Sequence, residues 1–132
     1  MRKALIAFVA ALSLACFDEG VTGSSTVTGT YTLRTVNGSP LPYTIPGGGA
    51  VKTEIVSDTI TLFQGGTFAR ARDSRITENG QVTMQSATET GSYSLLGTSI
   101  TLNSVTGKAT LGIINGNAMT IVEAGVTSVF SK

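Results

Sequence analysis

The sequence predicts an all-β domain, an antiparallel up-and-down β-barrel of about eight to ten strands. Short runs of alternating apolar and polar residues recur from residue 29 to residue 130, and glycine-containing pairs separate them. After the first sixteen residues, no stretch has the periodicity and length of a helix that could cover the apolar side of the sheet. The sheet must therefore cover itself, by closing into a barrel or by folding into a sandwich, and closure also removes its exposed edges.

The first half of the domain alternates strands with marked interruptions. The first strand is expected at residues 29–35, and Asn37-Gly38 forms its turn. The next stretch, residues 38–50, contains three prolines, which exclude a central strand. The pattern resumes over residues 51–63, with a break or bulge expected at Ser57-Asp58.

The second half continues as a series of hairpins. A strand at 67–75 follows Gly65-Gly66 and ends before the turn Asn79-Gly80. Residues 81–95 are consistent with one long strand interrupted near Gly91 or with two strands. Shorter strands follow to the end of the chain, separated by the turns Leu96-Gly97, Thr106-Gly107, Asn115-Gly116 and Ala124-Gly125.

Composition excludes several classes of function. The 132 residues suffice for one small domain, and the net charge of +1 leaves no basic stripe for nucleic acid. With no histidine, the chain lacks the usual general base and the commonest metal ligand. The spacing of Glu54, Glu78 and Glu89 does not single out an acid/base pair, and no motif activates a serine or threonine. We therefore expect no catalytic residues, no metal site and no cofactor.

The N-terminus has the pattern of an export signal over residues 1–15. A positive start, Met1-Arg2-Lys3, precedes eleven apolar residues, too few to span a bilayer. Small residues and then Cys16, the only cysteine, follow directly, which resembles a bacterial lipoprotein signal and implies a lipidated Cys16 as the new N-terminus. Simple secretion and an uncleaved anchor are the alternatives. Residues 16–27 are rich in Gly, Ser, Thr and acidic residues and predict a flexible tether.

The barrel region, residues 28–132, carries a second resemblance. Gly29-Thr30-Tyr31 resembles the Gly-x-Trp start of lipocalins, with Tyr31 in the place of Trp. Residues 29–42, followed by repeated Thr-Ile-Thr-Leu runs, resemble small bacterial lipocalin-like envelope proteins. The resemblance implies an up-and-down barrel with a ligand cavity at one mouth. The chain departs from lipocalins at its end, Phe130-Ser131-Lys132, which lacks the arginine that lipocalins stack on their Trp.

The resemblance also suggests candidate ligand-binding residues. In lipocalins the long loop after the first strand covers the cavity, and the matching segment here, residues 38–50, offers Leu41, Tyr43 and Ile45. Tyr31 is a further candidate ligand-binding residue. The alternative, which we favour, is that this segment plugs the end of the barrel or pairs as a short extra strand.

Two arginines interrupt the alternation of one strand. If Phe68 points inward, strict period two also directs Arg70 and Arg72 inward, where unpaired guanidinium groups would be very costly. We therefore favour an orientation in which Arg70 and Arg72 are solvated outside. In the alternative, both lie at an open mouth and hold a ligand carboxylate or phosphate by paired hydrogen bonds.

These observations lead to one expected function and one alternative. We expect an exported, lipid-anchored, monomeric barrel that binds a small apolar or amphiphilic ligand without catalysis. Its partner would be the membrane, through the anchor, and because Phe17 and not Asp follows Cys16, we favour the outer membrane. The alternative location is outside the membrane, as a secreted or periplasmic protein. The alternative function is a structural or protein-interaction envelope lipoprotein whose barrel interior is filled with side chains.

Overall fold

The structure, a computed structural model, describes residues 27–132. The predicted signal peptide, Cys16 and the predicted tether up to residue 26 lie outside the described residues. Within them, no helix is long and apolar enough to cross a membrane. The strands are β1 (Gly29–Val36), β2 (Ser39–Pro40), β3 (Tyr43–Thr44), β4 (Val51–Leu62), β5 (Thr67–Glu78), β6 (Gln81–Leu96), β7 (Ser99–Ser104), β8 (Ala109–Asn115), β9 (Ala118–Glu123) and β10 (Val126–Ser131).

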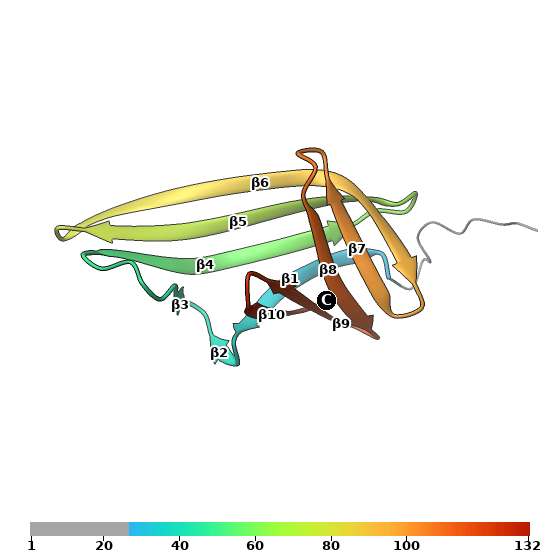
Figure 1. The fold of residues 1–132 in the computed structure, drawn as a ribbon, viewed down its shortest axis with the longest axis horizontal. Helices are drawn as coiled ribbons and strands as arrows, with labels where there is room; N and C mark the ends of the chain where they lie inside the picture. The colour runs from blue at the N-terminus through green and yellow to red at the C-terminus, as the bar shows by residue number, and fades with distance from the viewer. Residues whose placement is uncertain (1–26) are drawn as a thin grey trace, which may run out of the picture.

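The sheet closes into an antiparallel, up-and-down barrel (Figure 1). Neighbouring strands follow the order β1-β10-β9-β8-β7-β6-β5-β4, and β4 pairs back onto β1, from Gly29↔Leu62 to Thr32↔Thr59. The first and last long strands, β1 and β10, are also paired, at Thr32↔Ser131 and onward. The predicted all-β barrel is thus confirmed, with eight strands in the closed sheet and two short extra strands, β2 and β3.

The predicted turns are present because their residues tolerate the required backbone. Asn37 and Gly38 have φ of 49° and 78°, and Asn79 and Gly80 have φ of 51° and 74°. Two successive positive φ values give a tight hairpin turn whose twist matches that of the flanking strands. The same holds at Ala124-Gly125. Two predicted turns lie one residue later than expected, at residues 97–98 and 116–117, because Leu96 pairs with Ser99 and Asn115 with Ala118, so that glycine takes the first place of the loop.

A bulge in β4 decides which residues of this strand face inward. The β4–β5 register shifts between Ile55 and Ser57, next to the predicted break. Beyond the shift, Asp58, Ile60 and Leu62 are all buried. The extra residue allows this strand to direct side chains inward on both sides of the bend.

The candidate break in residues 81–95 does not divide the strand, because β6 is continuous from Gln81 to Leu96. Its register with β5 runs from Gln81 to Ser92, and its register with β7 starts at Gly91. A Cβ at Gly91 would collide with the main-chain carbonyl oxygen of Asn103 and with the ring of Phe68. Glycine at this position thus lets β5, β6 and β7 approach closely where the pairing of β6 with β5 ends and its pairing with β7 begins.

The interior of the barrel is filled by side chains from every long strand. Tyr31, a candidate ligand residue, is fully buried, and its hydroxyl donates to the carbonyl oxygen of Val27 at 2.7 Å. Lys132 Nζ lies 5.3 Å from the centroid of the Tyr31 ring and makes a cation–aromatic contact with it. The other largest fully buried apolar side chains are Phe130, Ile60, Leu62, Ile100, Leu102, Met119, Ile121 and Val36.

The strands β4, β5 and β6 are longer than the rest and extend beyond the barrel as a three-stranded projection (Figure 1). We call this projection the blade and define it as residues 51–57, 73–78 and 81–89. On its outer face Arg75 donates to Glu54 at 2.8 Å, and Lys52 lies 2.9 Å from the same carboxylate. These hydrogen bonds lower the pKa of Glu54 to about 2.

Candidate functional site

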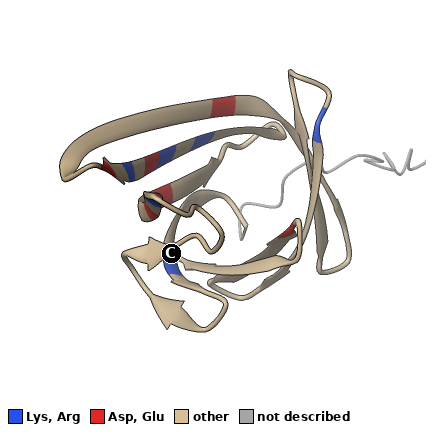
Figure 2. Cartoon of the chain, turned by 60° about the vertical axis from the view of Figure 1, so that its left-hand side comes forward, with Lys and Arg blue, Asp and Glu red and all other residues tan. Residues whose placement is uncertain are grey.

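The barrel changes character at the mouth from which the blade extends. Toward the other end most of its inward side chains are apolar, whereas at this mouth three charged side chains lie inward, Asp58 of β4, Arg70 of β5 and Glu123 of β9. Figure 2 shows charged residues along β4 and β5 and again on the opposite wall of the barrel. Each charged residue continues the inward register of its strand: Arg70 follows Phe68, and Glu123 follows Ile121.

The favoured prediction that the arginines lie outside in solvent is wrong. Arg70 is 6% exposed and faces the same side as Phe68, and Arg72 lies opposite the buried Asp58 and pairs with it on that same side. The penalty for burying an unpaired guanidinium does not arise, because two carboxylates meet it. Arg70 Nε donates to both Asp58 oxygens at 3.1 and 3.2 Å, and its Nη2 donates to Oδ2 at 2.8 Å. Its Nη1 and Nη2 donate to Glu123 at 3.1 and 3.2 Å.

Arg72 and Lys108 extend this cluster toward solvent. Arg72 donates from Nε to Asp58 Oδ2 at 2.9 Å, and 30% of its side chain is exposed. Lys108, in the turn between β7 and β8, donates to Glu123 Oε1 at 2.9 Å, and the hydroxyl of Thr110 donates to the same oxygen at 3.3 Å. We call Asp58, Arg70, Arg72, Lys108 and Glu123 the mouth cluster.

The mouth cluster fixes the charge of its members. Burial raises the pKa of Glu123, but hydrogen bonds from Arg70 and Lys108 and their charges outweigh burial, and the pKa falls to about 2. Burial lowers the pKa of Arg70, yet the hydrogen bonds and charges of Asp58 and Glu123 raise it above the ordinary value. At neutral pH Glu123 is therefore a carboxylate and Arg70 a guanidinium ion.

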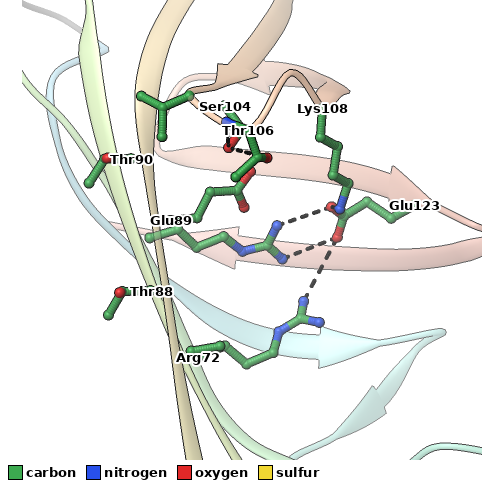
Figure 3. Close-up of a pocket in the computed structure, with 11 residues that line it drawn as sticks. Arg72, Thr88, Glu89, Thr90, Ser104, Thr106, Lys108 and Glu123 are labelled. Carbon is green, nitrogen blue, oxygen red and sulfur yellow. Dashed lines mark hydrogen bonds and ion pairs between the residues drawn. The ribbon is translucent and has the colours of Figure 1, made fainter.

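A pocket of about 380 Å³ lies at this mouth, and members of the mouth cluster form part of its wall. Its wall is formed by Arg70 and Arg72, by residues 87–90 of β6, by the β7–β8 turn and by Glu123 (Figure 3). Ser104 and Thr106 share a hydrogen bond of 2.9 Å at the turn. Two groups in the wall keep unused capacity: within the described residues, the carboxylate of Glu89 makes no hydrogen bond or ion pair, and Nη1 of Arg72 makes no hydrogen bond.

An apolar groove of about 640 Å³ adjoins this pocket. The pocket and the groove share Thr90, Ser104 and Val105, at the point where β6 leaves β7. The rings of Phe63 and Phe68 contribute to the groove, and Val105 is 78% exposed between the two hollows. Together they present ionised groups on one side and an apolar surface on the other.

The remaining candidate residues lie outside this pocket. Leu41 and Tyr43 pack against the barrel core, and Ile45 is 41% exposed. Tyr43 begins the short strand β3, where it pairs with Ile55, and its hydroxyl accepts from Asn37 Nδ2 at 3.1 Å. The predicted extra strand is therefore present, and no residue of this segment lines the pocket with Arg70 and Arg72.

Sequence reasoning missed Asp58, Lys108 and Glu123 as members of the site. A signal was available for the two carboxylates: Asp58 occupies the register of Ile60 and Leu62, and Glu123 that of Met119 and Ile121. An acidic residue at an inward position of one strand predicts a basic partner at an inward position of another. Lys108 carries no such signal, because its place in a turn does not fix its direction.

Comparison of the chain with protein-family models, with curated proteins and with solved structures finds no match. The fold itself is compatible with a lipocalin-like barrel, since eight antiparallel strands close in up-and-down order. Among residues 27–132, no group of three or more Cys, Asp or Glu side chains is placed to hold a metal ion.

Proposed function

We propose that this protein is an exported, Cys16-lipidated, lipocalin-like barrel of the cell envelope that binds a small amphiphilic molecule with an ionised head group. The observation that carries the proposal is the pocket at the mouth, whose wall holds free Glu89 and a partly free Arg72 beside an apolar groove. The head group would meet Arg72 and Lys108, and the apolar part would lie along Phe63 and Val105.

The filled interior directs the proposal to the mouth and away from the centre of the barrel. A purely apolar ligand inside the barrel would have to displace side chains such as Tyr31, Ile60 and Phe130, which are fully buried. Truncating one such side chain to alanine in a packed core costs about 2–5 kcal/mol, and a ligand that displaces the side chain forfeits the same contacts. An amphiphile at the mouth leaves this core intact.

Binding without catalysis is the favoured form of the proposal. Glu123 has a pKa of about 2, far from the range in which a general acid or base works near neutral pH. Arg70 is held by five hydrogen bonds to two carboxylates and has no freedom to reach a reacting group. These groups are suited to fixing charge and not to moving protons.

A fluorescent fatty-acid probe with a free carboxylate tests the binding site. The soluble chain from residue 21 retains every described strand, and the probe should show saturable enhancement that unlabelled fatty acid displaces. Changing Arg72 and Lys108 together to Gln should weaken binding about tenfold or more, since each charge-assisted hydrogen bond contributes about 1.5–3 kcal/mol.

Arg34→Gln is the matched control, because Arg34 is exposed on β1 and donates to Ser131 at 2.8 Å, away from the pocket. It removes one positive charge and should leave probe affinity unchanged. Absence of saturable enhancement, or equal weakening by Arg34→Gln, would overturn the assignment of the pocket.

The lipid anchor has its own test. Each acyl CH₂ in the bilayer contributes about 0.8 kcal/mol, so two or more chains on Cys16 would hold the protein durably. The full chain with Cys16→Ser should move from the membrane fraction to the soluble fraction. If fractionation is unchanged, the anchor proposal is wrong while the pocket proposal stands.

A protein-interaction role is the second candidate, and the filled interior favours it. In that case the described surfaces, and not a small-molecule pocket, carry the function. Failure of every charged or neutral amphiphilic probe to bind the mouth would favour this candidate.

A further inference from the structure

One strand of the blade has an edge that no other described strand covers. Over Gln81–Ser92, β6 pairs with β5 on one side, but on the other side it pairs with β7 only from Gly91 onward. Figure 1 shows β6 along the outer margin of the blade. The free edge runs from Gln81 to Glu89, because Val105 N donates to the carbonyl oxygen of Thr90 at 3.0 Å and closes the edge there.

The N–H and C=O groups of β6 point alternately toward β5 and toward the open edge. Two backbone hydrogen bonds show which residues point toward the edge. Tyr93 N donates to Gly66 O at 2.8 Å, on the β5 side, whereas the Thr90 carbonyl faces the β7 side. Since the register of β6 with both neighbours has no shift, the even-numbered residues 82, 84, 86 and 88 direct their N–H and C=O groups to the open edge.

This edge lacks the devices by which proteins prevent pairing. Its residues are Gln81-Val82-Thr83-Met84-Gln85-Ser86-Ala87-Thr88-Glu89, with no proline, no lysine and one charge at its end. Within residues 81–89, the pairing with β5 shows no bulge. Val82 and Met84 add apolar side chains that are 60% and 57% exposed. A long, straight, nearly uncharged edge is a template for another strand.

We propose that the edge is a dimer interface in which β6 of a second copy of this chain pairs antiparallel with β6. With a twofold axis at Gln85, residues 81–89 of one copy pair with residues 89–81 of the other. Even-numbered residues then lie opposite even-numbered residues, so their N–H and C=O groups can bond across the interface. In this register Met84 lies opposite Ser86 of the second copy, and Val82 lies opposite Thr88.

The charges and apolar side chains of the edge suit this partner. Glu89, the one charged residue, lies opposite Gln81 of the second copy, so no like charges meet. The two Met84 side chains are diagonal neighbours, within reach of each other at about 7–8 Å between their backbones. The edge is therefore self-complementary along its entire length, and the two blades would form one continuous six-stranded sheet.

Disulfide trapping tests the interface and its register together. The twofold axis places the two Gln85 Cα atoms opposite each other in a non-hydrogen-bonded pair, about 4.5 Å apart, which a disulfide spans. The chain from residue 21 contains every described strand and no other cysteine. Its Gln85→Cys variant should convert to a covalent dimer under mild oxidation, whereas Thr83→Cys alone should not.

A mixture of separate Thr83→Cys and Ala87→Cys chains should also form a covalent heterodimer, because these positions lie opposite each other. Equal trapping at positions 83 and 85 would contradict the register and indicate random collision. It would overturn the proposal.

A second measurement does not depend on introduced cysteines. Sedimentation of the unmodified chain from residue 21 should give the mass of two chains, falling to one on dilution. Met84→Pro should abolish the dimer, because its N–H points to the free edge and makes no bond to β5, whereas Met84→Thr keeps the N–H and should retain it. Retention of the native circular dichroism spectrum shows that Met84→Pro still folds. A single-chain mass for the unmodified protein at every concentration would overturn the proposal, whichever ligand the mouth binds.

Discussion

Replacing Arg70 by Met should destabilise the barrel more than any other single change in the mouth cluster. The substitution removes five hydrogen bonds and leaves Asp58, which is fully buried, with Arg72 as its remaining cationic partner. Removing one member of a buried ion pair costs about 3–5 kcal/mol, because here the buried Asp58 keeps only the partly exposed Arg72 as a partner and Glu123 keeps only Lys108 at close range. For a domain of this size the melting temperature should fall by on the order of 15–25 °C.

The matched control is Arg72→Met, which removes a guanidinium of the same chemistry from the same strand. Its side chain is 30% exposed, and Arg70 continues to neutralise Asp58 after the change. Solvent reaches the affected groups, so the cost should be about 1 kcal/mol. The difference between the two variants, and not either value alone, reports the effect of burial.

Urea unfolding followed by circular dichroism gives both free energies, and tyrosine fluorescence provides a second probe because the chain has three Tyr and no Trp. Equal m-values in the three proteins would show that the substitutions act on the folded state. If Arg70→Met costs no more than Arg72→Met, the reasoning from burial and charge is refuted.

Two further predictions concern acid stability and the close approach of strands at Gly91. The pKa of Glu123 is lowered from 4.5 to about 2 in the folded chain, so its contribution is complete above pH 4.5 and is lost as pH falls toward 2. This loss should amount to about 3 kcal/mol. Unfolding free energies measured between pH 2 and 6 should show a shallower slope for Glu123→Gln, and an unchanged slope would contradict the pairing. Gly91→Ala places a Cβ against the Asn103 carbonyl oxygen, and should cost about 2–3 kcal/mol. Ser92→Ala, one residue further along β6, should cost little, and thermal melts compare the two; equal melting temperatures would refute the steric argument.

Local patterns were sufficient to predict most of the barrel. Pairs such as Asn37-Gly38 and Asn79-Gly80 have few backbone choices, so their turns could be placed without knowledge of the neighbours. Alternation in the strands gave an apolar face that the sheet had to cover by itself, because no helix was expected to cover it. The pairing of β4 with β1 shows that the sheet does so by closing into a barrel and not by folding into a sandwich. The bulge near Ser57 was also expected, because alternation fails there.

The mouth cluster could not be predicted in the same way, since its members come from different strands. Arg70 was expected in solvent because burying an unpaired guanidinium is very costly, and the sequence does not show which residues of other strands would pair with it. Asp58 lies twelve residues before it and Glu123 fifty-three residues after it. Only the closed sheet brings these three side chains to one mouth.

The sequence by itself determined the class of fold, because periodicity and turn chemistry act over a few residues and need no distant contact. The tertiary structure alone decided that the interior is filled, that the arginine faces inward and that β6 has an uncovered edge. Each of these outcomes depends on which strands become neighbours, and on the burial and charge pairing that arise after they meet. A charged residue in a strand therefore has no fixed environment until the barrel closes around it.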